Sequence, residues 1–356
     1  MKQFKIENIN STMVSSSHKC HHNFSCLDDL IQWQIDSRNS LKEILGMEKF
    51  RPADPALQII SKTVKNDYFL YDLKMNTEPE ISMSFFLLTP PDVLSFSDLN
   101  NYPVVIVPHG HGSDGRYGPA GIFRHEDMEK KQQKYNHDLG IQFVRRGFLV
   151  ICPDARGSGD RRNAEDRGLE IDKLLSSSCN NLNFAFISIG TSLAAAWCWD
   201  LMSLVDLLIE KNWGDPDRIG VCGFSGGGAQ ALLLGALDKR VKCTGISGYF
   251  YKVEDCILTS NLCGCNFIPR FFEFFDMASL GKLIFPRSFI IEKGIDDPLN
   301  GLRGIDGPRE LVEEVHRVYT MLNKDKSIFQ YSEFPGVHEF NGKEIFSFFD
   351  RHLKYL

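Results

Sequence analysis

A serine flanked by glycines follows a short apolar segment of the chain. Residues 218–222 read as a mainly apolar, β-branched strand, and the pentapeptide Gly-Phe-Ser-Gly-Gly at 223–227 comes directly after it. An Ala- and Leu-rich stretch with helical spacing begins at once, so the pattern predicts a strand, a sharp turn and a helix. Small neighbours are required there because side chains at Gly223 or Gly227 would collide with the adjoining strand or helix. Ser225 is therefore the candidate nucleophile, and the alternative is a glycine-rich loop without chemistry.

Two later segments carry the partners that a nucleophilic serine needs. Such a serine requires a base that takes its proton and an acid that orients the base. Asp297 follows an apolar run, and the proline after it restricts its backbone, whereas its neighbour Asp296 competes for the same role. His338 follows a predicted strand and lies in a Pro-Gly turn just before the last helix. The order Ser225, Asp297, His338 is the one expected when each residue lies at the end of a different strand.

A polar, glycine-rich loop follows the apolar run at 102–108. Loops at the carboxyl ends of central strands hold the sites of α/β sheets. The backbone N–H groups of His111, in this loop, and of Gly226 are the predicted oxyanion hole. His109 and His111 raise a metal alternative, but no Cys or carboxylate in the loop completes an obvious ligand set. We therefore predict neither a metal nor another cofactor.

The side chains expected to line the substrate pocket are His109, Asp154, Arg156 and Phe224. Asp154 and Arg156 follow the strand predicted at 148–152. They could line the pocket or recognise a substrate carboxylate, and they could equally form a structural ion pair. The sequence favours neither interpretation.

Two groups of cysteines are interpreted without a metal. Cys256, Cys263 and Cys265 lie in a Phe-rich insertion and lack a fourth partner at standard zinc spacing, so we expect small thiols packed in a cap. The His- and Cys-containing segment at 18–26 also fits no standard zinc module.

Bulk composition excludes several classes of partner. The 356 residues carry a formal net charge of -6 without a Lys/Arg block, which argues against nucleic acid. No apolar run reaches about 18 residues, so no transmembrane helix is expected, and the N-terminus lacks the pattern of a signal peptide. Ten cysteines in such a chain favour reduced thiols and a cytoplasmic location. A homo-oligomer is left open.

Strand and helix patterns alternate along most of the chain. Strands are predicted at 57–64, 68–73 and 81–88, as an antiparallel opening, and then at 102–108, 148–152, 218–222, 241–247, 288–292 and 328–333. Helices are predicted at 27–47, 129–146, 191–211, 226–237, 307–323 and 342–353, and residues 160–190 are expected to be irregular. This alternation predicts an α/β fold with a mostly parallel, doubly wound sheet. We expect a flexible lead-in at 1–27 and a single domain at 28–356, with insertions near 155–190 and 249–285.

Taken together, these segments resemble the α/β-hydrolase superfamily, and within it the bacterial dienelactone-hydrolase-like and acetyl-xylan-esterase-like esterases. The resemblance rests on His-Gly-His-Gly at 109–112, Pro-Asp-Ala-Arg-Gly-Ser-Gly-Asp at 153–160, the serine turn at 223–228 and the histidine turn at 336–342. It covers about residues 28–356 and implies the α/β-hydrolase fold with cap-like insertions. It also implies that Asp297 takes the position of the catalytic acid. Ser225 departs from true dienelactone hydrolases, which use a cysteine nucleophile.

These features favour a serine esterase or deacylase acting on a small-molecule ester, without a nucleic-acid or membrane partner. One alternative is a peptidase or amidase of the prolyl-oligopeptidase type. Such proteins usually carry a large extra domain, and 356 residues leave no room for one. The other alternative is a non-catalytic binding protein that retains the fold.

Overall fold

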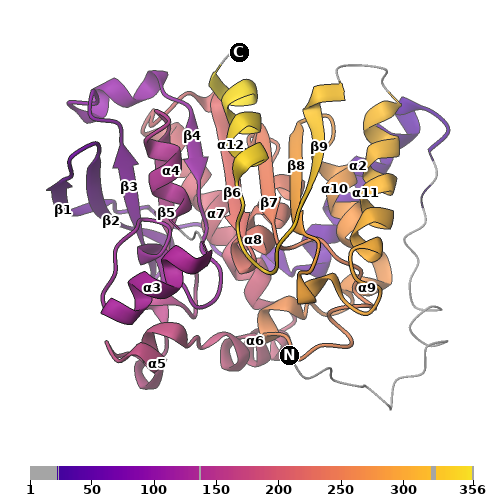
Figure 1. Ribbon diagram of the computed structural model, residues 1–356, viewed down its shortest axis with the longest axis horizontal. Coiled ribbons are helices and arrows are strands. Elements are labelled where there is room, and N and C mark those ends of the chain that lie inside the picture. The colour runs from indigo at the N-terminus through magenta and orange to yellow at the C-terminus, as the bar shows by residue number, and fades with distance from the viewer. Residues whose placement is uncertain (1–21, 23, 136–137, 322–325, 355–356) are drawn as a thin grey trace.

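Nine strands form one mixed sheet in the computed structural model, which describes residues 22, 24–135, 138–321 and 326–354 (Figure 1). The strand order across the sheet is β1-β2-β3-β5-β4-β6-β7-β8-β9. The strands are β1 (Gln58–Val64), β2 (Phe69–Glu78), β3 (Ile81–Thr89), β4 (Val104–Ile106), β5 (Leu149–Pro153), β6 (Ile219–Phe224), β7 (Cys243–Ser247), β8 (Ser288–Gly294) and β9 (Phe329–Phe334).

The sheet changes character between its two halves. Strands β1, β2, β3 and β5 pair antiparallel, whereas β5, β4, β6, β7, β8 and β9 pair parallel. Every residue of β4, β5, β6 and β7 is buried, as expected for parallel strands covered on both faces. The predicted mostly parallel sheet with antiparallel N-terminal strands is confirmed.

Helices cover both faces of this sheet (Figure 1). They are α2 (Leu27–Ile44), α3 (Glu126–Tyr135), α4 (Leu139–Val144), α5 (Ile171–Leu175), α6 (Cys179–Ser188), α7 (Leu193–Glu210), α8 (Gly226–Leu237), α9 (Phe271–Phe274), α10 (Met277–Ile284), α11 (Asp306–Thr320) and α12 (Lys343–Phe349). One buried cluster joins side chains of α2, α7, α8, α10 and α11 to the sheet, and a second joins those of α4 and α12. Two apolar layers therefore hold the strand ends in place.

Two expectations about helices were wrong in detail. The helix predicted at 129–146 is two helices, because α4 buries its apolar residues against the sheet whereas α3 is strongly polar. Residues 160–190, expected to be irregular, contain α5 and α6. Side-chain hydrogen bonds join α6 to residues 264–267, far along the chain, so local sequence carries no sign of this support. Helix α10 lies within the segment expected to be an insertion, at 249–285, and all of its residues are buried.

Within the described residues, no single helix combines the length and apolar composition needed to cross a membrane; α6 and α7 meet that test only as a pair bent by 95°. The flexible lead-in predicted at 1–27 and the group at 18–26 lie largely outside the described residues.

Candidate active site

The turn between β6 and α8 places Ser225 in an unusual backbone conformation. Its φ is 56° and its ψ is -121°, a combination that residues other than glycine rarely adopt. A Cβ on Gly223 would lie 2.1 Å from the carbonyl oxygen of Gly227, and one on Gly227 would lie 2.2 Å from that of Pro108. The backbone therefore approaches both positions too closely for any side chain, which explains why glycine is needed at each of them.

Ser225, His338 and Asp297 form a continuous chain of hydrogen bonds. Ser225 Oγ lies 2.8 Å from His338 Nε2, and His338 Nδ1 lies 2.9 Å from Asp297 Oδ2. The Asp297 side chain is 1% exposed and that of His338 is 27% exposed, so the arrangement opens toward solvent only at its histidine and serine end. Asp296, the competing candidate, is exposed. The sequence predicted these three residues as the candidate site, and the structure places them in contact.

Asp297 is held by groups that favour its ionised form. Its Oδ1 accepts the backbone N–H of Leu299 at 2.8 Å, and Oδ2 lies 3.4 Å from Lys293 Nζ. Burial alone raises the pKa of the Asp297 carboxyl, but the hydrogen bond from His338 and the charge of Lys293 outweigh it and lower the pKa below its ordinary value. Asp297 is thus suited to stay ionised beside the imidazole.

Glu292 holds the segment that carries His338. Its Oε1 accepts Ser247 Oγ–H at 2.8 Å and the backbone N–H of Asn341 at 3.0 Å, and its Oε2 accepts the N–H of Gly342 at 2.8 Å. Burial raises the pKa of this carboxyl, while these hydrogen bonds oppose the shift. Sequence reasoning missed both Glu292 and Lys293. Two adjacent charges inside a buried parallel strand were the available signal.

The loop at 109–112 packs directly on the serine turn. A Cβ on Gly110 would lie 2.9 Å from the carbonyl oxygen of Phe224 and 3.5 Å from the backbone nitrogen of Gly226. Gly226 is the first residue of α8, where N–H groups have no acceptor within the helix. This position is consistent with the predicted oxyanion hole of His111 and Gly226.

Two of the expected pocket residues support the site. His109 Nε2 accepts the backbone N–H of Ala155 at 3.1 Å, so its Nδ1, 3.0 Å from the carbonyl oxygen of Gly110, is the donor. Burial lowers the pKa of His109, in keeping with a neutral ring. The Phe224 ring lies 4.8 Å from that of His338 and is mostly buried.

Asp154 and Arg156 each form buried ion pairs. Asp154 Oδ2 lies 2.7 Å from Arg116 Nη1, and Asp154 has no exposed surface. Arg156 contacts both oxygens of Asp200, at 3.0 and 2.7 Å, and Glu78 at 2.7 Å. These partners favour the structural ion-pair interpretation of both residues.

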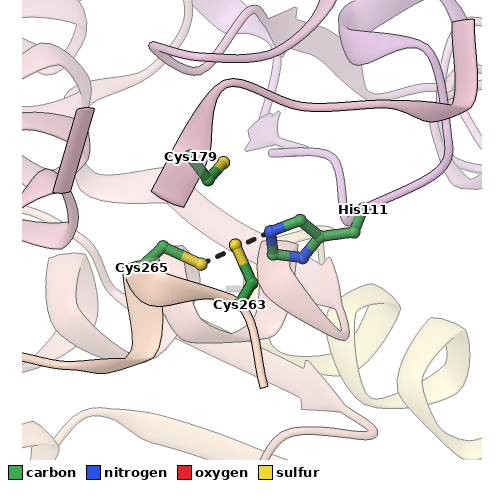
Figure 2. Close-up of side chains that lie close together, drawn as sticks. All are labelled: His111, Cys179, Cys263 and Cys265. Atoms are coloured by element: carbon green, nitrogen blue, oxygen red, sulfur yellow. Dashed lines mark hydrogen bonds between the residues drawn. The ribbon is translucent and has the colours of Figure 1, made fainter. Parts of the chain in front are cut away.

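One histidine of the loop at 109–112 lies close to three cysteine side chains. His111, Cys179, Cys263 and Cys265 come from three separate segments and lie close together (Figure 2). Cys263 and Cys265 were expected only to pack as thiols, and Cys179 was not singled out. His111 and Cys265 are 154 positions apart, so no spacing rule could have joined them.

The sheet order, the serine turn and the three aligned side chains define an α/β-hydrolase. The sequence profile of the Abhydrolase family matches residues 7–316, and the chain belongs to this family. The protein named “Putative hydrolase YtaP” of Bacillus subtilis (strain 168) is 26% identical over 223 residues, which is 61% of this chain and 67% of that protein.

Solved structures share the fold. A “putative acetyl xylan esterase” from Bacteroides fragilis is 17% identical with a TM-score of 0.73, over 91% of this chain and 80% of that one. A glucuronoyl esterase from Teredinibacter turnerae is 16% identical with a TM-score of 0.62, over 95% of this chain and 90% of that one.

Proposed function

We propose that this protein is a serine hydrolase that cleaves a carboxylic ester through an acyl-enzyme on Ser225. The observation that carries the proposal is the pair of contacts made by His338, at 2.8 Å to Ser225 Oγ and 2.9 Å to Asp297 Oδ2. The esterase names of the solved neighbours support an ester as the substrate.

The proposed mechanism gives each residue a step. His338 Nε2 takes the hydroxyl proton as Ser225 Oγ attacks the carbonyl carbon, and Asp297 stabilises the imidazolium that results. The N–H groups of Gly226 and His111 stabilise the oxyanion. His338 then gives the proton to the leaving alcohol. A water molecule, activated by the same imidazole, attacks the acyl-enzyme and releases the acid and Ser225.

A fluorophosphonate probe and p-nitrophenyl acetate test the mechanism. The wild type is expected to be labelled and to release p-nitrophenol, and both reactions are expected to disappear in Ser225→Ala. Ser188→Ala, which changes an exposed serine on α6, is the matched control and should behave like the wild type. Labelling that survives in Ser225→Ala contradicts the proposed nucleophile.

The substrate is best sought with esters of different acyl and alcohol parts. Acetylated sugars and uronate esters belong in this panel because the neighbours are named for such esters. A folded wild type that neither reacts with the probe nor hydrolyses any ester would support the binding-protein alternative. Cytoplasmic location remains part of the proposal and is checked by cell fractionation.

A further inference from the structure

We infer that His111, Cys179, Cys263 and Cys265 form a four-coordinate zinc site that ties two surface segments to the loop beside Ser225. Each residue offers one ligand atom, and these atoms all lie within 4.8 Å of one another. Figure 2 shows the four side chains close together, with the sulfur atoms of Cys263 and Cys265 beside an imidazole nitrogen of His111. Among the described residues, this is the one group of three or more His, Cys, Asp or Glu side chains whose ligand atoms lie so close together.

The spacing suits a tetrahedral ion. Zinc bonds of about 2.3 Å to sulfur and about 2.0–2.1 Å to nitrogen place tetrahedral ligand atoms roughly 3.5–3.8 Å apart. His111 Nε2 and Cys265 Sγ are already 3.3 Å apart. The widest pair of donors therefore needs to approach by only about 1 Å.

The segments that carry the donors are held together independently of any metal. Asn180 Oδ1 accepts the backbone N–H of Gly264 at 2.6 Å, and Asn183 Nδ2 donates to the carbonyl oxygens of Gly264 and Phe267. Asn266 Nδ2 donates to the carbonyl oxygen of Cys263 at 3.0 Å. These contacts connect Cys179, at the start of α6, with the turn of Cys263 and Cys265, and so orient the ligands as outer hydrogen bonds do in metal sites.

The donor chemistry selects the metal. Three thiolates and one imidazole are a donor set of structural zinc sites, and hard cations such as Mg²⁺ and Ca²⁺ prefer oxygen. Cys179 and Cys265 are buried and the other two residues are half-buried, which limits access of water to the sulfur atoms. Cys179 also begins the ten-residue helix α6, whose N-terminus favours negative charge. Four protein ligands make a closed site, so its role is to hold structure.

Zinc at this place acts on the loop that carries His111. A Cβ on Gly226 would lie 2.9 Å from His111 Nδ1, so this nitrogen faces the start of α8, while Nε2 faces Cys265. A metal bound to Nε2 leaves the ring proton on Nδ1 and fixes the ring orientation. The site therefore links α6 and the turn at 263–265 to the residue whose backbone N–H is proposed to stabilise the oxyanion.

Metal content tests the site directly. The full chain, without a histidine tag, is purified under reducing conditions, and zinc is counted by elemental mass spectrometry. We expect one zinc per chain, and a fall in Tm on chelation that added Zn²⁺ reverses. Replacement by Co²⁺ should give strong thiolate-to-cobalt absorption in the near ultraviolet. A wild type without zinc, without this absorption and without a Tm response would overturn the proposal.

Matched cysteine variants locate the metal. Cys263→Ser and Cys265→Ser are expected to lose the zinc and the cobalt absorption. Cys256→Ser changes a buried thiol of the same region, and Cys26→Ser changes an exposed thiol; both should keep one zinc per chain. Zinc retained by the Cys263→Ser, Cys265→Ser double variant contradicts the assignment, as does equal loss in Cys256→Ser. The chelated wild type supplies a readout that does not depend on the folding of any variant.

Two outcomes separate this site from other roles. The chain could be isolated without zinc and with a disulfide among these cysteines, although no oxidant was added. That result would indicate a redox role for the cysteines and overturn the proposal. Lower ester turnover on chelation rests on the proposed function, whereas the zinc count and the cobalt spectrum do not. A zinc-bound protein without esterase activity would therefore contradict the proposed function and still support the metal site.

Discussion

Lys293 Nζ lies 3.4 Å from Asp297 Oδ2, the same oxygen that contacts His338 Nδ1 at 2.9 Å. Both charged side chains are buried, with 0% and 1% of their surfaces exposed. Burial lowers the pKa of Lys293, and the carboxylate opposes that shift. The lysine thus supplies a buried positive charge beside Asp297, the proposed catalytic acid.

Lys293→Met is expected to lower the free energy of unfolding by roughly 3–5 kcal/mol at neutral pH, because Asp297 loses a buried partner. The pKa of Asp297 is lowered in the folded protein, so its ionised form contributes stability above its unfolded pKa, and this contribution disappears as pH falls through the lower folded value. The variant raises that folded pKa, so its deficit should be largest near pH 7 and shrink below about pH 4. Urea unfolding across this range measures the deficit.

A deficit that does not change with pH would mean that Lys293 serves only packing. Lys282→Met is the control, since it removes another buried lysine whose partner is Glu314, on α11. Lys282→Met should lower stability and leave kcat of the folded protein unchanged. Lys293→Met should lower kcat with little change in KM, as expected for a residue that positions the catalytic acid.

Asp297→Asn should reduce kcat by about four orders of magnitude, because an amide no longer stabilises the imidazolium or fixes the tautomer of His338. Asp296→Asn is the matched change one position earlier, where the side chain is exposed, and it should retain wild-type turnover. Ester hydrolysis by the two purified variants decides between the candidates. Equal losses, or a larger loss in Asp296→Asn, would reverse the assignment of the acid.

The sequence predicted the serine, the aspartate, the histidine and the strands that carry them, because each motif is local. Ser225 depends on glycines within two positions, and His338 depends on a strand, a turn and a helix that follow one another. The sheet pattern was equally local, since buried strands of β-branched residues recur between helical segments.

The residues that surround and support the candidate site were not predictable in the same way. Cys179 meets His111 only because α6 packs on a turn more than eighty positions later, and that contact depends on the asparagines of α6. Glu292 was visible as a charge in a strand, but the groups that donate to its carboxylate lie far away in the sequence, at Ser247, Asn341 and Gly342. Tertiary contacts of this kind leave no periodic signal in one sequence.

Ser225→Gly and Ser225→Ala should both abolish turnover but differ in stability. The backbone at Ser225 has a φ of 56°, which glycine adopts freely and alanine does not. Relief of strain worth about 1–3 kcal/mol, set against the entropy cost of glycine of about 0.5–1 kcal/mol, should leave the glycine variant more stable by about 1 kcal/mol. Urea unfolding of the two variants measures this difference.

The same pair of substitutions at Ser203, inside α7, gives the opposite expectation. There the glycine variant should be less stable than the alanine variant by about 1 kcal/mol, because glycine is unfavourable within a helix. If glycine is the less stable choice at both positions, the turn at Ser225 stores no such strain.

Arg156 distinguishes an ion pair from a substrate contact. Its side chain is 11% exposed and binds Asp200, whose side chain is 2% exposed and also contacts Arg161. Burial raises the pKa of Asp200, but the charges of Arg161 and Arg156 outweigh it and lower the pKa. Asp200→Asn and Arg156→Gln should each lower the free energy of unfolding by roughly 3–5 kcal/mol. Arg309→Gln, which breaks the pair of an exposed guanidinium with Glu333, should cost much less stability than either buried change.

Kinetics with paired substrates complete this test. If Arg156 only holds Asp200 and Glu78, the folded Arg156→Gln variant keeps the wild-type ratio of kcat/KM for a carboxylate-bearing ester to that for its neutral analogue. If it binds a substrate carboxylate, loss of a charge-assisted hydrogen bond lowers that ratio by about tenfold or more. The carboxylates of Asp200 and Glu78 already satisfy the guanidinium, so an unchanged ratio is the expected result.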